Sequence, residues 1–180
     1  MSRTRTLAQQ TRVLLVLGRV SNLPTVWSNC LAAWLLGGEG PWDRFGLLCL
    51  GATLLYSGGM FLNDAFDVGF DRRYRSERPI VSGQVSLRFV WIAGTTLLGI
   101  GWLVIVPLGS NAAFFGILLV LGIVFYNWIH KRTSLAPLLM ACCRFLLYLM
   151  SASAAQLGFS QAVVWFALAL FCYKIGRAHV

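Results

Sequence analysis

The chain has 180 residues, of which 58% are hydrophobic and only 12% are charged, and its 15 Lys and Arg against 6 Asp and Glu give a net charge of +9. A water-soluble domain with so few charges could not cover its surface with polar groups, so most of its surroundings are predicted to be lipid. The positive charge lies in short gaps between long apolar runs, as in membrane proteins. We therefore expect no nucleic-acid partner, and we interpret the five cysteines as small core residues.

Apolar stretches long enough to cross a bilayer follow one another along the chain. A helix needs about 20 mostly apolar residues to cross about 30 Å of hydrocarbon. Five stretches satisfy this length and a sixth begins; in order they cover residues 11–38, 45–71, 89–108, 111–130, 135–158 and 161–173. The sequence therefore predicts an all-α, polytopic transmembrane helix bundle with five full spans and the start of a sixth.

Positive residues are concentrated in alternate gaps between these stretches. Ten of them lie before residue 13, between residues 72 and 88, or at residues 131–132, whereas the other gaps contain only Arg44. Because cytoplasmic loops carry the excess of Lys and Arg, the ten-residue set is predicted to face the cytoplasm. We expect an integral protein of an inner (plasma) membrane, with its N-terminus and residues 72–88 on the cytoplasmic side.

Four of the six acidic residues lie between residues 64 and 77. At about 100° per residue, Asn63, Asp64, Asp67 and Asp71 share one arc of a helix about 100° wide. Three carboxylates crowded together at low dielectric repel one another unless a cation neutralises them. Such oxygen ligands suit Mg²⁺, which bridges carboxylates to substrate phosphates, so these four residues are predicted metal ligands and catalytic residues. The alternative is a solvated helix end whose acids pair with nearby arginines.

Arginines follow the acidic segment. Arg72, Arg73, Arg75 and Arg78 lead into a turn-rich loop at residues 79–83. Because a planar guanidinium matches the geometry of phosphate oxygens, Arg72, Arg75 and Arg78 are predicted to bind a diphosphate. The alternative for each of them is an ordinary positive charge of a cytoplasmic loop.

The acidic motif resembles that of a known family. The run from Asn63 to Asp71 matches the pattern Asn-Asp-x-x-Asp-x-x-x-Asp of the UbiA-type intramembrane prenyltransferases, and residues 78–83 are similar to the Arg-Pro-x-x-Ser-Gly segment that follows it there. Residues 18–24 and 126–132 are also similar, and the resemblance extends over residues 11–173. It implies about nine helices around a cavity that opens to lipid. It also implies transfer of a prenyl chain from a polyprenyl diphosphate to an acceptor, usually aromatic, with Mg²⁺ as cofactor.

The resemblance also implies roles for single residues. Asn63, Asp67 and Asp71 would hold the metal that binds the diphosphate, and Asp64 would ligate or orient it. Many family members place a Lys four residues after the Tyr that ends the fourth span. Here His130 takes that place and Lys131 lies five residues after Tyr126, so all three residues are candidate diphosphate contacts and the choice between His130 and Lys131 stays open.

Two arginines lie inside the predicted spans. Arg19 is expected to pair with Asn22, one turn on, so that both face the cavity and the substrate; the alternative is an Arg that snorkels to the cytoplasmic surface. Arg144 lies near the middle of its span with Tyr148 four residues later. Burying an Arg there costs at least about 2.5 to 3.5 kcal/mol, so a partner or a wet cavity is expected. We predict that Arg144 helps to hold the acceptor or its carboxylate.

The sequence departs from the family in one large respect. The family has a second aspartate-rich motif after its sixth helix, whereas no Asp or Glu follows Glu77 here. We therefore expect residues 1–173 to be the N-terminal part of a prenyltransferase domain, inactive by itself. Residues 174–180 resemble a translated sequencing adapter and are interpreted as a non-native tail of a truncated gene; a genuine basic cytoplasmic tail is the alternative.

Two other classes of function compete with prenyl transfer. CDP-alcohol phosphotransferases also use an Asp-x-x-x-Asp pattern, but theirs requires Asp-Gly-x-x-Ala-Arg, and this chain reads Val-Gly-Phe-Asp-Arg after Asp67. A non-catalytic membrane carrier or scaffold with a structural divalent-cation site is the remaining alternative. No motif identifies the acceptor, and an apolar cavity does not indicate whether it holds a benzoate, a naphthoate, a tetrapyrrole or a sugar alcohol.

Overall fold

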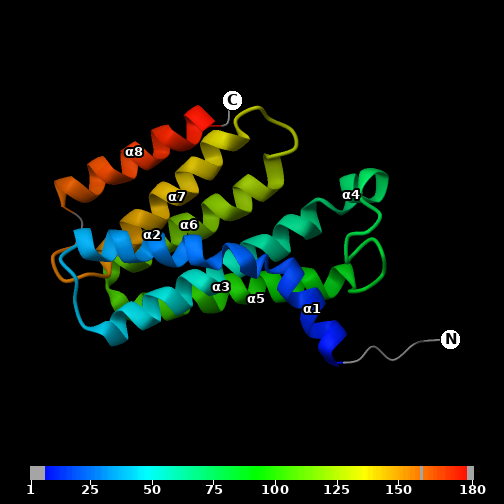
Figure 1. Cartoon of the computed structure of the whole chain (residues 1–180), viewed down its shortest axis with the longest axis horizontal. Coiled ribbons are helices and arrows are strands. Elements are labelled where there is room, and N and C mark those ends of the chain that lie inside the picture. The colour runs from blue at the N-terminus through cyan, green and yellow to red at the C-terminus, as the bar shows by residue number, and fades with distance from the viewer. Residues whose placement is uncertain (1–6, 159, 178–180) are drawn as a thin grey trace.

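The computed structural model describes residues 7–158 and 160–177, and all regular structure in these residues is helical. In chain order the elements are α1 (Leu7–Leu17), η1 (Val20–Asn22), α2 (Leu23–Leu36), α3 (Trp42–Phe66), α4 (Val68–Tyr74), α5 (Leu87–Ile105), η2 (Val106–Leu108), α6 (Ser110–Ile129), α7 (Ala136–Ser153) and α8 (Gln161–Arg177). Figure 1 shows the long helices side by side, with α1 and α4 at one end of the bundle and α8 along the outside of α7.

Within the described residues, four helical segments are long and apolar enough to cross a membrane. They are α3, α5 together with η2, α6 and α7, and the apolar part of α8, Gln161–Tyr173, is shorter than a span. Large apolar side chains such as Leu103, Phe114 and Trp128 point outward and are 56–61% exposed, as lipid-facing residues are. The predicted all-α transmembrane bundle is confirmed, and the chain is an integral membrane protein.

The first predicted span is wrong as a single helix. Helix α1 ends at Leu17, Arg19 adopts a left-handed conformation (φ 43°, ψ 47°), and α2 begins only at Leu23. Pro24 explains the break, because a proline lacks the N–H that a continuous helix needs and its ring clashes with the preceding turn, yet it fits the first turn of a new helix. Residues 11–38 therefore form two helices, α1 and α2, separated by a break. Neither of them is among the four described helical segments that are long enough to cross a membrane.

The second predicted span also changes at its end. Helix α3 stops at Phe66, and Asp67 joins it to the short helix α4. The backbone N–H of Asp67 still donates to the carbonyl oxygen of Asn63 (3.0 Å), and that of Asp71 donates to the carbonyl oxygen of Asp67 (2.9 Å). The near-helical register thus persists through the junction.

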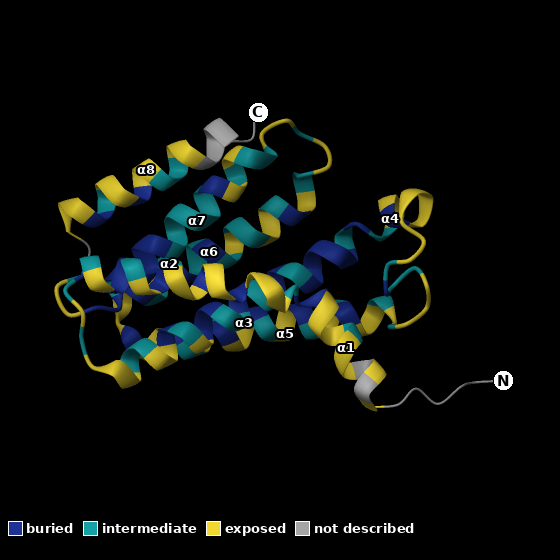
Figure 2. Cartoon of the chain, viewed as in Figure 1, coloured by how far each residue is buried: buried dark blue, intermediate teal, exposed yellow. Residues whose placement is uncertain are grey.

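Helix α3 is the centre of the bundle and packs against α2, α5 and α6. Its contact with α5 is close because glycines face each other: a Cβ on Gly58 would lie 2.8 Å from the carbonyl oxygen of Gly94, and one on Gly101 would lie 3.0 Å from the backbone nitrogen of Leu55. Figure 2 shows buried residues along much of α3, including the end that meets α4. This packing fixes the helix that carries most of the acidic motif.

At the end of the bundle opposite α4, the side chain of Arg44 makes hydrogen bonds to backbone carbonyl groups. The Arg44 guanidinium donates to the carbonyl oxygen of Leu108 (2.6 Å) and to that of Ala154 (3.4 Å), which terminate η2 and α7. Such bonds satisfy carbonyls that a helix end leaves unpaired. Some of the predictions concern residues that the structure does not describe. These residues are Arg3 and Arg5, which we used for the topology, and residues 178–180 of the predicted non-native tail.

Candidate active site: a carboxylate–cation cluster beside a membrane cavity

The four polar residues of the acidic motif are all buried. Asn63 and Asp64, on α3, are 7% and 4% exposed, Asp67 at the junction is 7% exposed, and Asp71 on α4 is 2% exposed. The alternative of a solvated helix end is wrong about the solvent, which barely reaches the three carboxylates, but its pairing of acids with nearby arginines is present: Arg75 lies 4.0 Å from Asp71 and Arg78 lies 3.5 Å from Asp64.

Two arginines from distant parts of the chain meet at Asp64. The Arg19 Nη2 lies 3.4 Å from Asp64 Oδ1, and the Arg78 Nη1 lies 3.5 Å from the same oxygen. Arg19 reaches this position from the break between α1 and α2, where its strained backbone conformation directs the side chain toward α3. The predicted side-chain pairing of Arg19 with Asn22 is wrong, because the Arg19 guanidinium donates to Asn63 and Asp64. Asn22 contacts Arg19 through its backbone N–H, which donates to the Arg19 carbonyl oxygen (2.9 Å), and both residues line the cavity as expected.

Asp67 and Asp71 face other basic side chains. His130 Nε2 lies 3.2 Å from Asp67 Oδ1 and Lys131 Nζ lies 3.4 Å from Asp67 Oδ2, so both candidates for the family's Lys position meet the same carboxylate. Arg75 Nη1 lies 4.0 Å from Asp71 Oδ1. We call Asp64, Asp67 and Asp71 with Arg19, Arg75, Arg78, His130 and Lys131 the carboxylate–cation cluster.

The predicted diphosphate-binding residue Arg72 is not part of this cluster. It is exposed on α4 and makes no ion pair with the described acids. Phe70, which the sequence reasoning missed, lies between two members instead: Lys131 Nζ is 3.9 Å and the Arg75 guanidinium carbon is 5.7 Å from the centre of its ring. A ring at this distance attracts cations and helps to hold them near the acids.

Some carboxylate oxygens of the cluster accept no hydrogen bond and could therefore bind a ligand. Asp64 Oδ2 and Asp71 Oδ1 are buried and accept no hydrogen bond within the described part of the chain. Within residues 7–158 and 160–177, no three His, Cys, Asp or Glu side chains lie close enough to enclose a metal ion. Mg²⁺ does not require such a cage, because it keeps several waters and uses one or two carboxylates together with substrate phosphates. One or two of the carboxylates of Asp64, Asp67 and Asp71, with the Asn63 oxygen, thus fit Mg²⁺ that arrives with a phosphate ligand.

A buried amide pair adjoins the acids. Asn63 Nδ2 donates to Asn127 Oδ1 (3.1 Å), and Asn127 Nδ2 donates to the carbonyl oxygen of Gly59 (3.1 Å). Asn127 is only 3% exposed and lies on α6 beside Tyr126, whose ring stacks on His130 with centroids 5.0 Å apart. The sequence reasoning passed over Asn127, although an amide within the last turn of an apolar helix was a visible signal.

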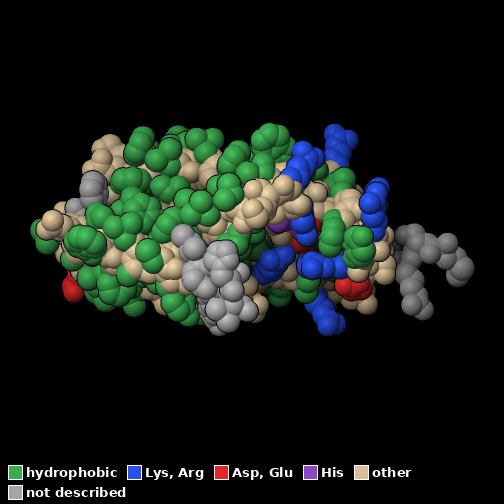
Figure 3. Space-filling model, turned by 90° about the horizontal axis from the view of Figure 1, so that it is seen from above, with side chains coloured by type: hydrophobic (Ala, Val, Ile, Leu, Met, Phe, Trp, Pro, Cys, Tyr) green, Lys and Arg blue, Asp and Glu red, His purple; other side chains and the backbone are tan. Residues whose placement is uncertain are grey.

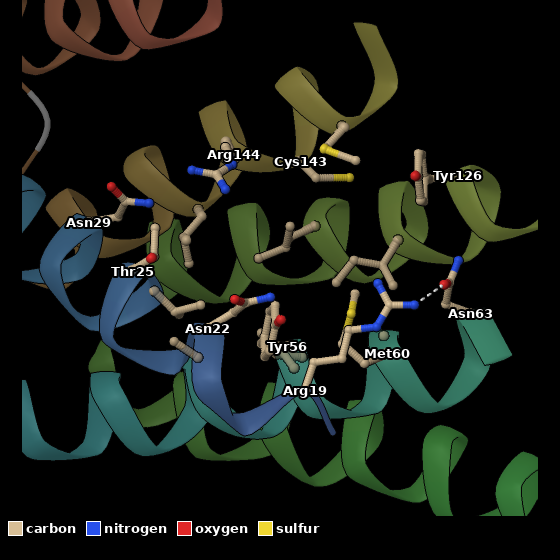
Figure 4. Close-up of a pocket in the computed structure, with 18 of the residues that line it drawn as sticks. Arg19, Asn22, Thr25, Asn29, Tyr56, Met60, Asn63, Tyr126, Cys143 and Arg144 are labelled. Carbon is tan, nitrogen blue, oxygen red and sulfur yellow. Dashed lines mark hydrogen bonds between the residues drawn. The ribbon is translucent and has the colours of Figure 1, made fainter. Parts of the chain in front are cut away.

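A cavity of about 390 Å³ extends from the cluster into the bundle (Figure 4). Residues of η1 and α2, α3, α6 and α7 line it, and its walls are largely apolar: they include Val26, Ala52, Leu55, Met60, Leu119, Ile123, Met140 and Leu147. Arg19, Asn63, Tyr126 and Asn127 mark the end that touches the cluster. An apolar pocket with polar groups gathered at one end suits a ligand with a hydrocarbon body and a charged head.

Arg144 marks another polar part of the cavity. Its guanidinium points inward from α7, and Asn22, Thr25, Asn29 and Tyr56 line the same space (Figure 4). Arg144 has no ion pair with an acid in the described residues, although it lies within a predicted span. Tyr148 does not line this space; it is buried and its ring lies 6.5 Å from that of Phe166 on α8.

On the surface, too, the charged residues are separated from the apolar ones. Figure 3 shows Lys and Arg gathered near one end of the molecule, with acidic side chains and a His between them, whereas hydrophobic side chains cover most of the remaining visible face. The charged end therefore contains the cluster, and the apolar remainder is what a lipid environment requires.

Comparison with known sequences decides the family. A profile of the UbiA prenyltransferase family matches residues 21–180. The chain belongs to the UbiA prenyltransferase family. The match includes the whole carboxylate–cation cluster apart from Arg19, and it confirms the resemblance drawn from the acidic motif.

Individual UbiA-family relatives differ in what they act on. A 4-hydroxybenzoate octaprenyltransferase from Acidovorax ebreus is 27% identical over 146 residues, which are 79% of this chain and 50% of that protein. A digeranylgeranylglyceryl phosphate synthase from Metallosphaera sedula is 34% identical over 89 residues, which are 49% of this chain and 31% of that protein. The chain thus matches at most about half the length of these curated relatives.

A solved structure supports the UbiA-family fold. The structure, described as that of digeranylgeranylglyceryl phosphate synthase in membranes, superposes with a TM-score of 0.79 at 19% identity. The superposition covers 94% of this chain and 60% of that chain. At this identity the likeness establishes the shared fold.

Proposed function

We propose that this protein is an Mg²⁺-dependent integral-membrane transferase that moves a prenyl chain from a polyprenyl diphosphate to an acceptor held in the same cavity. The observation that carries the proposal is the placement of three buried carboxylates, each facing a basic side chain, beside an apolar cavity that Arg19 and Asn63 line. A prenyl diphosphate has the matching form, with a charged head and a long hydrocarbon tail.

Two groups of residues in and beside the cluster would bind the metal ion and the diphosphate, respectively. Asn63, Asp64, Asp67 and Asp71 supply the oxygens that would hold Mg²⁺. When bound, the ion neutralises the diphosphate oxygens and so makes the diphosphate a better leaving group. Arg78 and Lys131, which are 25% and 38% exposed, are free enough to turn from the acids to phosphate oxygens. They would hold the charge that develops on the leaving group.

The cavity would control what happens to the allylic carbon. Its apolar walls bind the hydrocarbon chain and exclude water, which would otherwise capture the carbon that loses diphosphate. Tyr56 and Tyr126 line the same space, and the faces of their rings would attract a carbon that becomes positive. An electron-rich acceptor atom then forms the new bond as the carbon–oxygen bond to diphosphate breaks.

Charge balance in the cluster suggests that metal and diphosphate bind together. Three acids face Arg19, Arg75, Arg78 and Lys131 in addition to His130, so the cluster has no excess negative charge without the ligand. Adding Mg²⁺ alone would leave a large positive charge at low dielectric, whereas an Mg²⁺–diphosphate pair brings both signs. The cations would then pass from the carboxylates to the phosphates as the ion takes their place.

Arg144 suggests the chemistry of the acceptor. A guanidinium that lines an apolar cavity without an acid partner is costly in a membrane, and an anionic group on a ligand would offset the cost. We propose that the acceptor carries an acidic group, such as a carboxylate, that pairs with Arg144 while Asn22 and Asn29 offer further hydrogen bonds. Two relatives that act on 4-hydroxybenzoate or on a glycerol phosphate lipid, judged by their names, use acceptors of that kind.

We further propose that the cluster faces the cytoplasm. Arg75, Arg78, Lys131 and Arg132 belong to the two loops at the α4 end of the bundle, Arg72 lies on α4 itself and Arg88 lies in the first turn of α5. Cytoplasmic segments carry such an excess of positive charge. In a bacterium the enclosing membrane would be the inner membrane.

The direct test is transfer of a radiolabelled prenyl group in membranes that contain the full-length gene product. Asp67→Ala and Asp71→Ala are expected to lower transfer by more than the about 10- to 100-fold that loss of an outer-shell partner of a metal site costs. Asp43→Ala is the matched control, because Asp43 is an exposed acid at the opposite end of the bundle from Asp71. Normal transfer in both cluster variants, at equal protein level, would exclude the proposed site.

A further inference from the structure

A row of hydrogen bonds connects the backbone of α3 to the carboxylate–cation cluster. The carbonyl oxygen of Gly59 accepts from Asn127 Nδ2, Asn127 Oδ1 accepts from Asn63 Nδ2, and Asn63 Oδ1 accepts from Arg19 Nη2 at 3.0 Å. Both amides are buried, with 3% exposure for Asn127 and 7% for Asn63. The last of these bonds is drawn in Figure 4.

The first end of the row determines which way each amide points. A backbone carbonyl can only accept a hydrogen bond, so Asn127 must turn its NH₂ toward Gly59 and its oxygen toward Asn63. Asn63 then has to present its NH₂ to Asn127. Its own oxygen is left facing the cluster.

The other end of the row requires the same orientation independently. A guanidinium can only donate, so the atom of Asn63 that faces Arg19 must be the oxygen. The two alternative orientations of an amide cannot be distinguished by shape, and only such partners fix them. Because the two ends agree, the whole row is consistent, and a flip of either amide would put two donors or two acceptors face to face.

We propose that Asn127 is a positioning residue that holds the side-chain oxygen of Asn63 toward the cations of the cluster. Asn63 alone can expose either an oxygen or an NH₂ to the site, and only the oxygen can ligate a metal ion or accept from Arg19. Arg19 imposes the same orientation only while it donates to Asn63, so Asn127 is the partner that excludes the second possibility once Arg19 turns toward a phosphate. The inference rests on the proposed function, since it assigns Asn63 to the cation side of a metal–diphosphate site.

An apolar side chain at position 127 could not replace the two hydrogen bonds that Asn127 makes. Asn127 lies where α3 and α6 approach closely: a Cβ on Gly59 would be 3.0 Å from Ile123 Cγ2 of α6. Because the helices are so close, the side-chain amide of Asn127 on α6 reaches the backbone carbonyl oxygen of Gly59 on α3. Leucine at position 127 would fill a similar volume without either hydrogen bond, and it would release Asn63 to rotate.

The experiment measures binding of Mn²⁺ in place of Mg²⁺, with inorganic pyrophosphate present. The purified full-length gene product, as wild type or variant, is titrated in lipid nanodiscs, and free Mn²⁺ is followed by electron paramagnetic resonance. Asn127→Leu is expected to weaken Mn²⁺ binding about tenfold, the loss that one misdirected polar ligand causes. Asn111→Leu, an exposed amide at the other end of α6, is the matched control and should bind as the wild type does.

A double-mutant cycle separates positioning from a general effect on the fold. If Asn127 acts through Asn63, then Asn127→Leu has no further effect on Mn²⁺ binding in a protein that already carries Asn63→Ala. Asn127→Ala, which introduces no new side-chain volume, should repeat the result and keeps the test valid if the leucine variant fails to insert.

Three outcomes are informative. Coupled effects of positions 63 and 127 support the proposal. Equal Mn²⁺ binding by wild type and Asn127 variants, or purely additive effects in the cycle, overturns it while the proposed function stands. No binding of Mn²⁺ with pyrophosphate by the wild-type chain overturns the proposed metal–diphosphate site itself, and with it the role of Asn127.

Discussion

Arg78 offers a prediction whose sign differs from that of a simple loss of a ligand-binding residue. In the ligand-free structure its Nη1 lies 3.5 Å from Asp64 Oδ1, where it competes with a metal ion for the carboxylate. Replacing it by Gln is therefore expected to strengthen binding of Mn²⁺ alone and to weaken binding of pyrophosphate. An ordinary damaging substitution would weaken both.

The magnitude follows from the geometry of the pair. At an effective dielectric constant of about 20, two unit charges about 4 Å apart interact with about 4 kcal/mol. Arg78 is 25% exposed, so water screens the pair and rearranges when the charge is removed. A net effect of about 1 to 1.5 kcal/mol remains, which corresponds to about 5- to 10-fold tighter Mn²⁺ binding. Loss of a charge-assisted contact should weaken pyrophosphate by about 10-fold or more.

Two titrations of the chain in nanodiscs measure these effects, one with Mn²⁺ alone and one with pyrophosphate at fixed Mn²⁺. Arg88→Gln is the control, because Arg88 is an exposed arginine on α5 outside the cluster. If Arg78→Gln weakens Mn²⁺ binding in the absence of pyrophosphate, then Arg78 does not compete for Asp64, and the exchange of cations between acids and phosphates is refuted.

Three further predictions concern other parts of the protein. Arg144→Leu is expected to raise the KM for the acceptor by about 10- to 100-fold, the cost of one hydrogen bond to a charged group. Its thermal stability should not fall, since a costly membrane charge is removed; an unchanged KM in steady-state kinetics would remove Arg144 from the acceptor site. A reporter enzyme that is active only in the periplasm should be inactive when fused after Arg75, and activity there would reverse the proposed orientation. The 180-residue chain alone is expected to transfer no prenyl group, because it covers only about half of its curated relatives and has one aspartate cluster; transfer at the rate of the full-length gene product, in membranes with equal protein, would contradict this.

The helices that cross the membrane could be predicted from sequence because one signal, apolar length, decides them. The residues of α3, α5, α6 and α7 fall inside the predicted stretches to within several residues. The first stretch misled that reasoning, since hydropathy does not register the geometry of Pro24 or the left-handed turn at Arg19. A proline close to a polar residue in an apolar run was the available warning.

The acidic motif could be predicted because its residues are close in sequence, but its partners could not. The spacing of Asn63, Asp64, Asp67 and Asp71 is a local property of one helical segment. Arg19 and Lys131 reach those acids only through the packing of α3 against its neighbours, which the sequence does not state. The same holds for Asn127, whose hydrogen bond to Gly59 depends on how closely α3 and α6 approach.

The central claim is that the carboxylates of α3 and α4 hold a metal ion together with a diphosphate. The most direct measurement is the ³¹P hyperfine coupling of bound Mn²⁺, recorded by electron–nuclear double resonance with a prenyl thiolodiphosphate that cannot react. We predict a ³¹P coupling in the wild-type protein and in Asp43→Ala, and its loss in Asp67→Ala and Asp71→Ala. A coupling that persists unchanged in both cluster variants would show that the metal–diphosphate pair binds elsewhere, and it would contradict the account.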